Sequence, residues 1–141
     1  MKKVFMNGAI DPAFIAESIA KHQSKHSIGA HNIFLGQVRA DAIEDKTVAA
    51  IEYTAYEEMA IEKLHEIREE AFTKFNLTCM HIYHSLGNVK AGEICFFVFV
   101  SSRRRKEVYA ATEWLVNQVK EHAPIFGKEI FEDESHQWKS P

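Results

Sequence analysis

The feature that most constrains the fold is an uninterrupted apolar stretch, ICFFVFV, which runs from Ile94 to Val100. A strand with one face in water alternates apolar and polar side chains, whereas a strand covered on both faces is apolar throughout. We therefore predict that residues 94–100 form a central strand of a sheet that is covered on both faces.

The remaining pattern predicts an α+β protein, because strands and helices follow one another in a mixed rather than a strictly alternating order. Residues 57–75 and the segment that ends at Pro124 have apolar positions at helical spacing, so we expect two long helices. A shorter helix should begin after Asp11, a favourable N-cap that is followed by Pro12. Further strands are expected at about 4–6, 29–38, 48–56 and 77–87, a polar loop at 40–46, and an irregular tail from about 130.

Length and charge restrict the class of protein. A chain of 141 residues suggests a single domain, 1–141, large enough to bury a core without metal or disulfide staples. The 17 basic and 20 acidic residues give a net charge of -3, which argues against general nucleic-acid binding. No apolar run approaches the roughly 20 residues that span a membrane. Cys79 and Cys95 lie in apolar segments, and without a signal peptide they indicate a reduced, cytoplasmic protein.

Three consecutive arginines, Arg103 to Arg105, lie between the central strand and the second long helix. Positive charge at a helix start opposes the helix macrodipole, which favours anions there. Free backbone N–H groups and fork-shaped guanidinium donors suit a phosphate or a carboxylate. A solvated basic corner would have the same sequence, so spacing alone leaves both interpretations open.

Two lysines, Lys120 and Lys128, bracket the end of the same helix. A lysine that is partly desolvated or close to other cations loses proton affinity and can act as a nucleophile or an acid/base. Most lysines are simply solvated. Arg105 and Lys120 follow one side of the helix but are fifteen residues apart, about 22 Å along its axis. If both serve one small substrate, they must come from different chains of a dimer.

The eight histidines raise the question of metal binding. His22 and His26 have the spacing of one helix face but lack the glutamate of zinc-protease helices. His81 and His84 are three apart in a predicted strand, so they should point to opposite faces of the sheet. His84 could line a site or be hydrogen-bonded in a core. From these spacings we expect no metal site and no cofactor.

Five segments together resemble the catalytic (large) subunit of molybdopterin synthase. The similarity extends from about Gly29 to Trp138, and its motifs are FLGQVR (34–39), IEYTAYEEMA (51–60), HSLGNVKAGE (84–93), SSRRRKEVYAA (101–111) and VKEHAPIFGKE (119–129). The resemblance implies a mixed, largely antiparallel sheet covered by two long helices. It also implies a homodimer of large subunits with one small ubiquitin-like sulfur-carrier subunit at each far end, two large plus two small subunits in all.

The same resemblance implies an activity and a set of residues. The family transfers sulfur from the C-terminal thiocarboxylate of the small subunit to cyclic pyranopterin monophosphate, which forms the molybdopterin dithiolene. By position, Lys120 corresponds to an essential lysine, as acid/base or as the partner of a transient amide. Arg39 and Arg105 would bind the phosphorylated pterin, and Phe34 would wall the pocket.

Three positions depart from the family's pattern. Arg104 stands where a histidine is usual, and we expect it to bind substrate beside Arg105; Thr54 stands where a glutamate is common. Gly127 stands where a catalytically important lysine is usual, and Lys128 follows directly. Lys128 could replace that lysine if the backbone shifts, with Gly127 supplying the freedom.

Two other functions remain compatible with these departures. One is a diverged, non-catalytic scaffold that still binds a ubiquitin-like tail or a phosphorylated ligand. The other is an unrelated domain that binds a phosphorylated ligand through the arginines alone. The leading interpretation is the sulfur-transferring synthase, with neither nucleic acid nor membrane as a partner.

Overall fold

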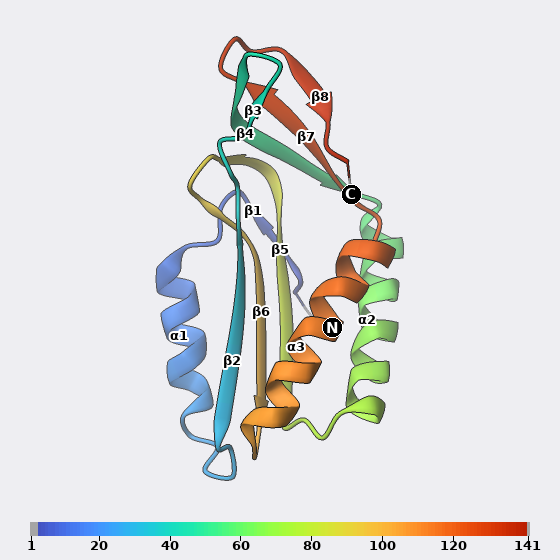
Figure 1. The fold of residues 1–141 in the computed structure, drawn as a ribbon. Helices are drawn as coiled ribbons and strands as arrows, with labels where there is room; N and C mark the ends of the chain where they lie inside the picture. The colour runs from blue at the N-terminus through green and yellow to red at the C-terminus, as the bar shows by residue number, and fades with distance from the viewer. Residues whose placement is uncertain (1–2, 141) are drawn as a thin grey trace.

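The computed structural model describes residues 3–140 as a sheet with helices on both faces (Figure 1). The elements follow the chain in the order β1 (Phe5–Asn7), α1 (Pro12–His22), β2 (Ala30–Gln37), β3 (Ala42–Ile43), β4 (Lys46–Ala55), α2 (Glu57–Lys74), β5 (Cys79–Lys90), β6 (Ile94–Ser102), α3 (Arg105–His122), β7 (Ile125–Phe131) and β8 (His136–Trp138).

The sheet is mixed and largely antiparallel, as predicted. Its strand order is β2-β6-β5-β4-β7-β8; β1 pairs with β5, and β3 pairs with β4. Only the short β1–β5 pairing is parallel among the ladders of residues 3–140. Strand β6 lies between β2 and β5, so the apolar stretch from Ile94 to Val100 is central, as its composition indicated.

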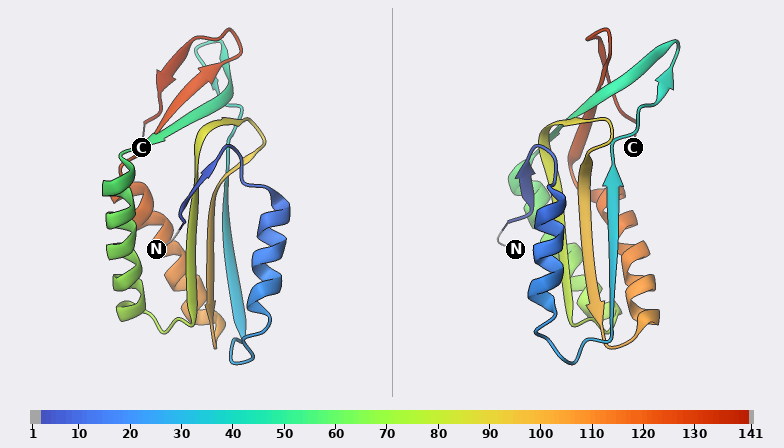
Figure 2. Two further views of the ribbon diagram at one scale, coloured as in Figure 1. Left: turned by 180° about the vertical axis from the view of Figure 1, so that it is seen from behind. Right: turned by 90° about the vertical axis from the view of Figure 1, so that its left-hand side faces the viewer.

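The two faces of β6 pack against different helices. Phe97 and Phe99 belong to a small core beneath α1, whereas Phe96, Val98 and Val100 belong to the large core beneath α2 and α3. Figure 2 shows α1 on one side of the strands and α3 on the other. Side chains alternate along a strand, so a fully apolar β6 satisfies both cores at once. The two long helices expected at residues 57–75 and before Pro124 correspond to α2 and α3, so this prediction is confirmed.

Strand β5 joins two halves of the sheet. Its first part, Cys79 to His84, pairs with β6, and its later part, Gly87 to Lys90, pairs with β4. Beyond β4 lie β7 and β8, which form the upper end of the molecule in Figure 1. The end of α3 lies beneath this upper half, so a hollow forms where the two halves of the sheet diverge.

Two segments expected to be irregular contain strands. Residues 40–46 include β3, which forms a hairpin with β4 through Glu44 and Asp45, both at positive φ. The tail after residue 130 includes the end of β7 and the whole of β8, joined by a tight turn with Glu134 at φ 70°. Neither turn contains glycine, the residue that normally marks a positive φ, and so no hairpin was predicted there.

The ends of the helices follow the local chemistry of the sequence. The Asp11 carboxylate accepts a hydrogen bond from the Ala13 backbone N–H at 2.8 Å, which caps α1 as predicted. Helix α3 ends at His122, two residues before Pro124. Within residues 3–140, no helix combines the length and apolarity that crossing a bilayer would take.

Candidate functional site

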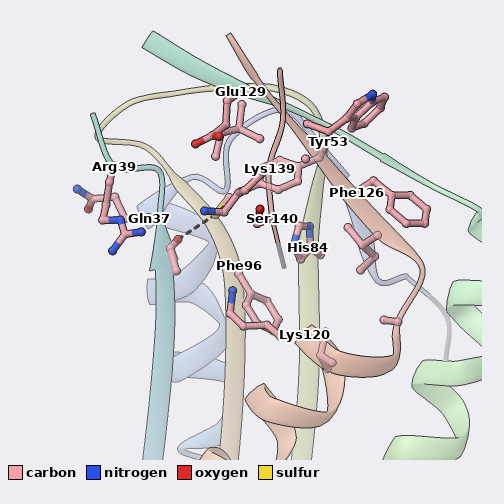
Figure 3. Close-up of a pocket in the computed structure, with 18 of the residues that line it drawn as sticks. Gln37, Arg39, Tyr53, His84, Phe96, Lys120, Phe126, Glu129, Lys139 and Ser140 are labelled. Carbon is pink, nitrogen blue, oxygen red and sulfur yellow. Dashed lines mark hydrogen bonds between the residues drawn. The ribbon is translucent and has the colours of Figure 1, made fainter. Parts of the chain in front are cut away.

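A cavity of about 690 Å³ lies between the end of α3 and the diverging strands (Figure 3). Its walls come from the end of β2, the start of β6, the middle of β5, the facing parts of β4 and β7, and the C-terminal segment. The volume falls within the range typical of sites for small organic ligands. The lining combines aromatic rings with several ionisable groups, which suits a flat, charged heterocycle.

Lys120 lines this cavity from the last turn of α3. Its ammonium lies 5.7 Å from the centre of the Phe96 ring (Figure 3). A cation at a helix C-terminus is stabilised by the macrodipole, and the aromatic face adds a further attraction. Lys120 is solvent-exposed, but it borders the hollow and lies beside an aromatic ring of its wall.

Arg39 and Phe34 also line the cavity, as the resemblance implied. The Arg39 Nε lies 3.4 Å from the Asp41 carboxylate, and three-quarters of its side chain is exposed. An exposed ion pair of this kind contributes little to stability, so Arg39 remains available to an incoming anion. Phe34 packs edge-on against Phe96, with ring centres 5.7 Å apart, and forms part of the apolar wall.

His84 was expected either to line a site or to be hydrogen-bonded in a core. It does both, because it is only 8% exposed and yet lines the cavity. Its Nδ1 donates to the Ser85 carbonyl at 2.8 Å, so the neutral ring presents its Nε2 as an acceptor. Burial, with a smaller contribution from the positive charge of Lys120, lowers the pKa of His84 to about 4. His81 points to the α1 face, so the predicted opposition of these two histidines is confirmed.

A chain of polar contacts forms the wall opposite Lys120. The Tyr53 hydroxyl donates to the Cys95 sulfur at 3.4 Å, and the Cys95 thiol donates to the Gly36 carbonyl at 3.5 Å. Burial, reinforced by the contact with Cys95, raises the pKa of the Tyr53 phenol. The Glu129 carboxylate lines the same wall, is 5% exposed and accepts from the Gln137 side chain at 3.1 Å.

The structure does not bring Lys128 to the cavity. Side chains alternate along β7; Gly127 and Glu129 face the hollow, and the Lys128 ammonium lies 3.4 Å from Glu52 on strand β4. A different cation, Lys139, lines the cavity from the C-terminal segment. Its backbone N–H donates to the Gly127 carbonyl at 2.8 Å, so Lys139 enters beside the glycine that stands where the family usually has lysine.

Arg104 and Arg105 lie at the other end of α3 and do not line the cavity. Both are exposed, and within residues 3–140 neither they nor Arg103 form an ion pair with a carboxylate. Arg104 occupies the N-cap position of α3, but its side chain makes no capping hydrogen bond. Within one chain, Arg104 and Arg105 therefore lie at the opposite end of α3 from Lys120 and the cavity, as the length of the helix requires.

Sequence reasoning missed most of the wall opposite Lys120. Tyr53, Glu129 and Lys139 become neighbours only because β4, β7 and β8 are adjacent, and β7 and β8 were not predicted. The one available signal was the alternating segment IFGKEIF after Pro124, which places Gly127 and Glu129 on the same face.

The sequence matches the family described as "MoaE protein" over residues 9–122. The molybdopterin synthase catalytic subunit of Pyrococcus abyssi is 38% identical over 124 residues, which cover 88% of this chain and 82% of the relative. That of Bacillus subtilis is 37% identical and covers 86% and 76%. That of Emericella nidulans is 38% identical over 84% of this chain, but the match spans only 60% of the longer fungal protein.

Solved structures agree with this assignment. Molybdopterin synthase from Staphylococcus aureus superposes with a TM-score of 0.86 at 30% identity, over 100% of this chain and 98% of that one. A complex of subunits 1 and 2 of molybdopterin-converting factor from Helicobacter pylori has a TM-score of 0.81 at 20% identity, over 97% and 89%, which is a likeness in fold. A match over residues 9–122 and relatives at 37–38% identity establish that this chain is a member of the MoaE protein family.

Proposed function

We propose that this chain is the catalytic subunit of molybdopterin synthase. It transfers sulfur from the C-terminal thiocarboxylate of a small ubiquitin-like subunit to cyclic pyranopterin monophosphate and so forms the molybdopterin dithiolene. The observation that carries the proposal is the cavity of about 690 Å³ in which Lys120, Arg39 and Phe34 meet. Relatives at 37–38% identity bear the corresponding name.

The charges of the cavity suit both reactants. The phosphorylated pterin and the thiocarboxylate tail are anionic, and Lys120 and Arg39 face the space that they would share. Fixed cations also stabilise the negative charge that develops as the sulfur attacks. Lys120 serves as the acid/base or as the partner of a transient amide, and Phe34 and Phe96 provide apolar surface for the heterocycle.

Lys139 supplies the second ammonium of this site. It lines the cavity beside Gly127, whereas the Lys128 side chain is directed to Glu52. A lysine at the neighbouring position of the same strand cannot simply take over the role, because adjacent residues of a strand point to opposite faces. A lysine that directly follows the next strand, β8, reaches the same space without any shift of β7.

Arg104 and Arg105 act on the substrate of a second copy of the chain. They lie at the far end of α3 from Lys120, yet they are exposed and free of internal ion pairs within residues 3–140. In a homodimer the exposed N-terminus of one α3 can approach the cavity of the partner chain and offer guanidinium groups to the phosphate. The complete assembly then has two large and two small subunits.

A cytoplasmic location is part of the proposal, and the cysteines support it. Cys79 and Cys95 are both free and buried, which suits the reducing cytoplasm.

The decisive experiment supplies the purified protein with pyranopterin substrate and with a small subunit that carries an authentic thiocarboxylate. Dithiolene product identifies a sulfurtransferase. A diverged scaffold would bind the small-subunit tail and yield no product. A protein that binds neither the tail nor the pterin would leave the arginines as a general phosphate site and would overturn the proposal.

A further inference from the structure

A second group of reactive side chains lies on the face of the sheet away from the cavity. Cys79 and His81 are two residues apart on β5, so both point toward α1. His22 is the last residue of α1 and reaches the same spot. The three donor atoms, two imidazole nitrogens and one sulfur, all lie within 4.8 Å of one another.

The separations are close to those of a metal centre. The Nε2 atoms of His22 and His81 are 2.8 Å apart. Tetrahedral zinc with bonds of about 2.0–2.3 Å to nitrogen and sulfur holds its ligand atoms roughly 3.3–3.7 Å from one another. The observed separations, from 2.8 Å to at most 4.8 Å, bracket that range.

Surrounding contacts prepare the ligands. The His22 Nδ1 donates to the Ser18 carbonyl at 2.7 Å, so in a neutral ring the lone pair is on Nε2, the atom that faces His81. Metal-bound histidines are characteristically fixed in this way by a carbonyl or carboxylate behind them. The Lys25 ammonium donates a hydrogen bond to the Cys79 sulfur at 2.7 Å, which fixes the position of that side chain.

We propose that His22, Cys79 and His81 form a zinc site that fastens the end of α1 to the start of β5. One thiolate and two imidazoles suit zinc and similar borderline metals, whereas magnesium and calcium prefer oxygen ligands. A water molecule would complete the tetrahedral shell, and His81 also lines a surface cavity of about 550 Å³.

The fold explains why the chain uses such a site here and why the sequence concealed it. The core beneath α1 contains only four buried residues, Ile10, Ile15, Phe97 and Phe99, so α1 is held by less apolar surface than α2 and α3. Histidines that are neighbours in the chain, His22 with His26 and His81 with His84, do not form the pair. The pair that meets is separated by 59 residues.

The test is a titration of the untagged, chelator-treated protein with Zn²⁺ and with Co²⁺ as a spectroscopic probe. We expect one ion per chain, a thiolate-to-cobalt charge-transfer band and the intense visible bands of tetrahedral cobalt. Cys79→Ser and His81→Gln should each weaken binding by about 100-fold or more. His26→Gln is the matched control, because His26 is exposed and lies four residues after His22, and its affinity should stay within about twofold.

Two further measurements use the unaltered chain and do not depend on how the variants fold. Free zinc at a hundred times the Kd should raise Tm by roughly 5–10 °C. Zinc should also slow alkylation of Cys79 while leaving Cys95 unchanged. Cobalt spectra without a thiolate band, unchanged affinity in a folded Cys79→Ser protein, or binding lost in His26→Gln would overturn the site and indicate adventitious binding by exposed histidines.

Discussion

The two ends of α3 both carry positive charge, but the fold treats them differently. At the N-terminus, Arg104 and Arg105 are exposed, and their charge opposes the helix macrodipole. At the C-terminus, Lys120 is favoured by the macrodipole and borders a cavity beside Phe96. The N-terminal end therefore presents exposed guanidinium groups outside the cavity, whereas the C-terminal end contributes a lysine to the lining of the cavity.

The difference shows that a cluster of cations in a sequence does not by itself define a site. Three adjacent arginines are a more conspicuous pattern than one lysine, yet only the lysine lies among residues from several strands. If the enzyme is a dimer with composite sites, the two ends of α3 are halves of one site in different chains.

Removal of the Lys120 ammonium, which lines the cavity, should reduce activity the most. We expect Lys120→Ala to lower dithiolene formation by about 10²–10⁴-fold, the range for loss of a general acid/base. Single-turnover assays with thiocarboxylated small subunit would measure it. Dimer formation and circular dichroism should be unchanged, because Lys120 is exposed and supports no core packing. Near-normal turnover would remove Lys120 from the mechanism.

The composite site can be tested by complementation. Arg105→Ala and Lys120→Ala should each be nearly inactive alone, and mixing the two should restore activity. Random exchange makes half of the dimers mixed, each with one intact site of two, so we expect about a quarter of wild-type activity. Mass spectrometry would confirm that mixed dimers form. If mixed dimers form and show no activity, Arg105 and Lys120 do not contribute to one site from different chains.

Variants of Lys139 and Lys128 test which of these two lysines supplies the second ammonium of the cavity. We expect Lys139→Ala to reduce turnover by about 10–100-fold, because a fixed positive charge is lost from the cavity. Lys128→Ala is the matched control and should change turnover by less than about threefold, because it loses only a partly exposed ion pair with Glu52. The opposite ranking of the two variants would return the role to Lys128.

The last prediction concerns stability rather than turnover, and it depends on pH and on the buried imidazole of the cavity. The folded pKa of His84 is about 4, against 6.5 for the free side chain, so between these values the unfolded chain binds more protons. Stability should therefore fall as pH decreases from about 6.5 toward 4. Between pH 7 and 4.5 the wild type should lose about 2–3 kcal/mol more than His84→Gln.

Urea unfolding at the two pH values would measure this difference. The pKa of His81 is also lowered, mainly by burial, but His81 is present in both proteins and its contribution cancels. Equal losses in the two proteins would show that His84 accepts a proton as readily in the folded protein as in the unfolded chain.

Much of the fold could be predicted because its strongest signals are local. The apolar stretch from Ile94 to Val100 identified the doubly covered strand, and Asp11, Pro12 and Pro124 marked helix ends. Strands β3, β7 and β8 were missed because their turns use glutamate and aspartate at positive φ, and because pairing with a distant strand leaves no local pattern.

The sequence offered Lys120 and His84 from their positions in predicted elements, and the resemblance added Arg39 and Phe34. Lys120, Arg39 and Phe34 were found in this way and meet in the cavity. Lys139 could not be found, because its approach to Gly127 depends on the pairing of β7 with β8. Registers of that kind are set by tertiary packing rather than by neighbouring residues.

The crowding at Gly127 has a consequence for how this chain can change. A Cβ atom there would lie 2.9 Å from the Ile51 side chain and 3.2 Å from the Tyr53 ring, closer than carbon atoms tolerate without movement. A lysine side chain at this position would therefore require the Ile51 or Tyr53 side chain to move or to be replaced by a smaller one. The same crowding limits position 127 to glycine as long as Ile51 and Tyr53 keep their present positions.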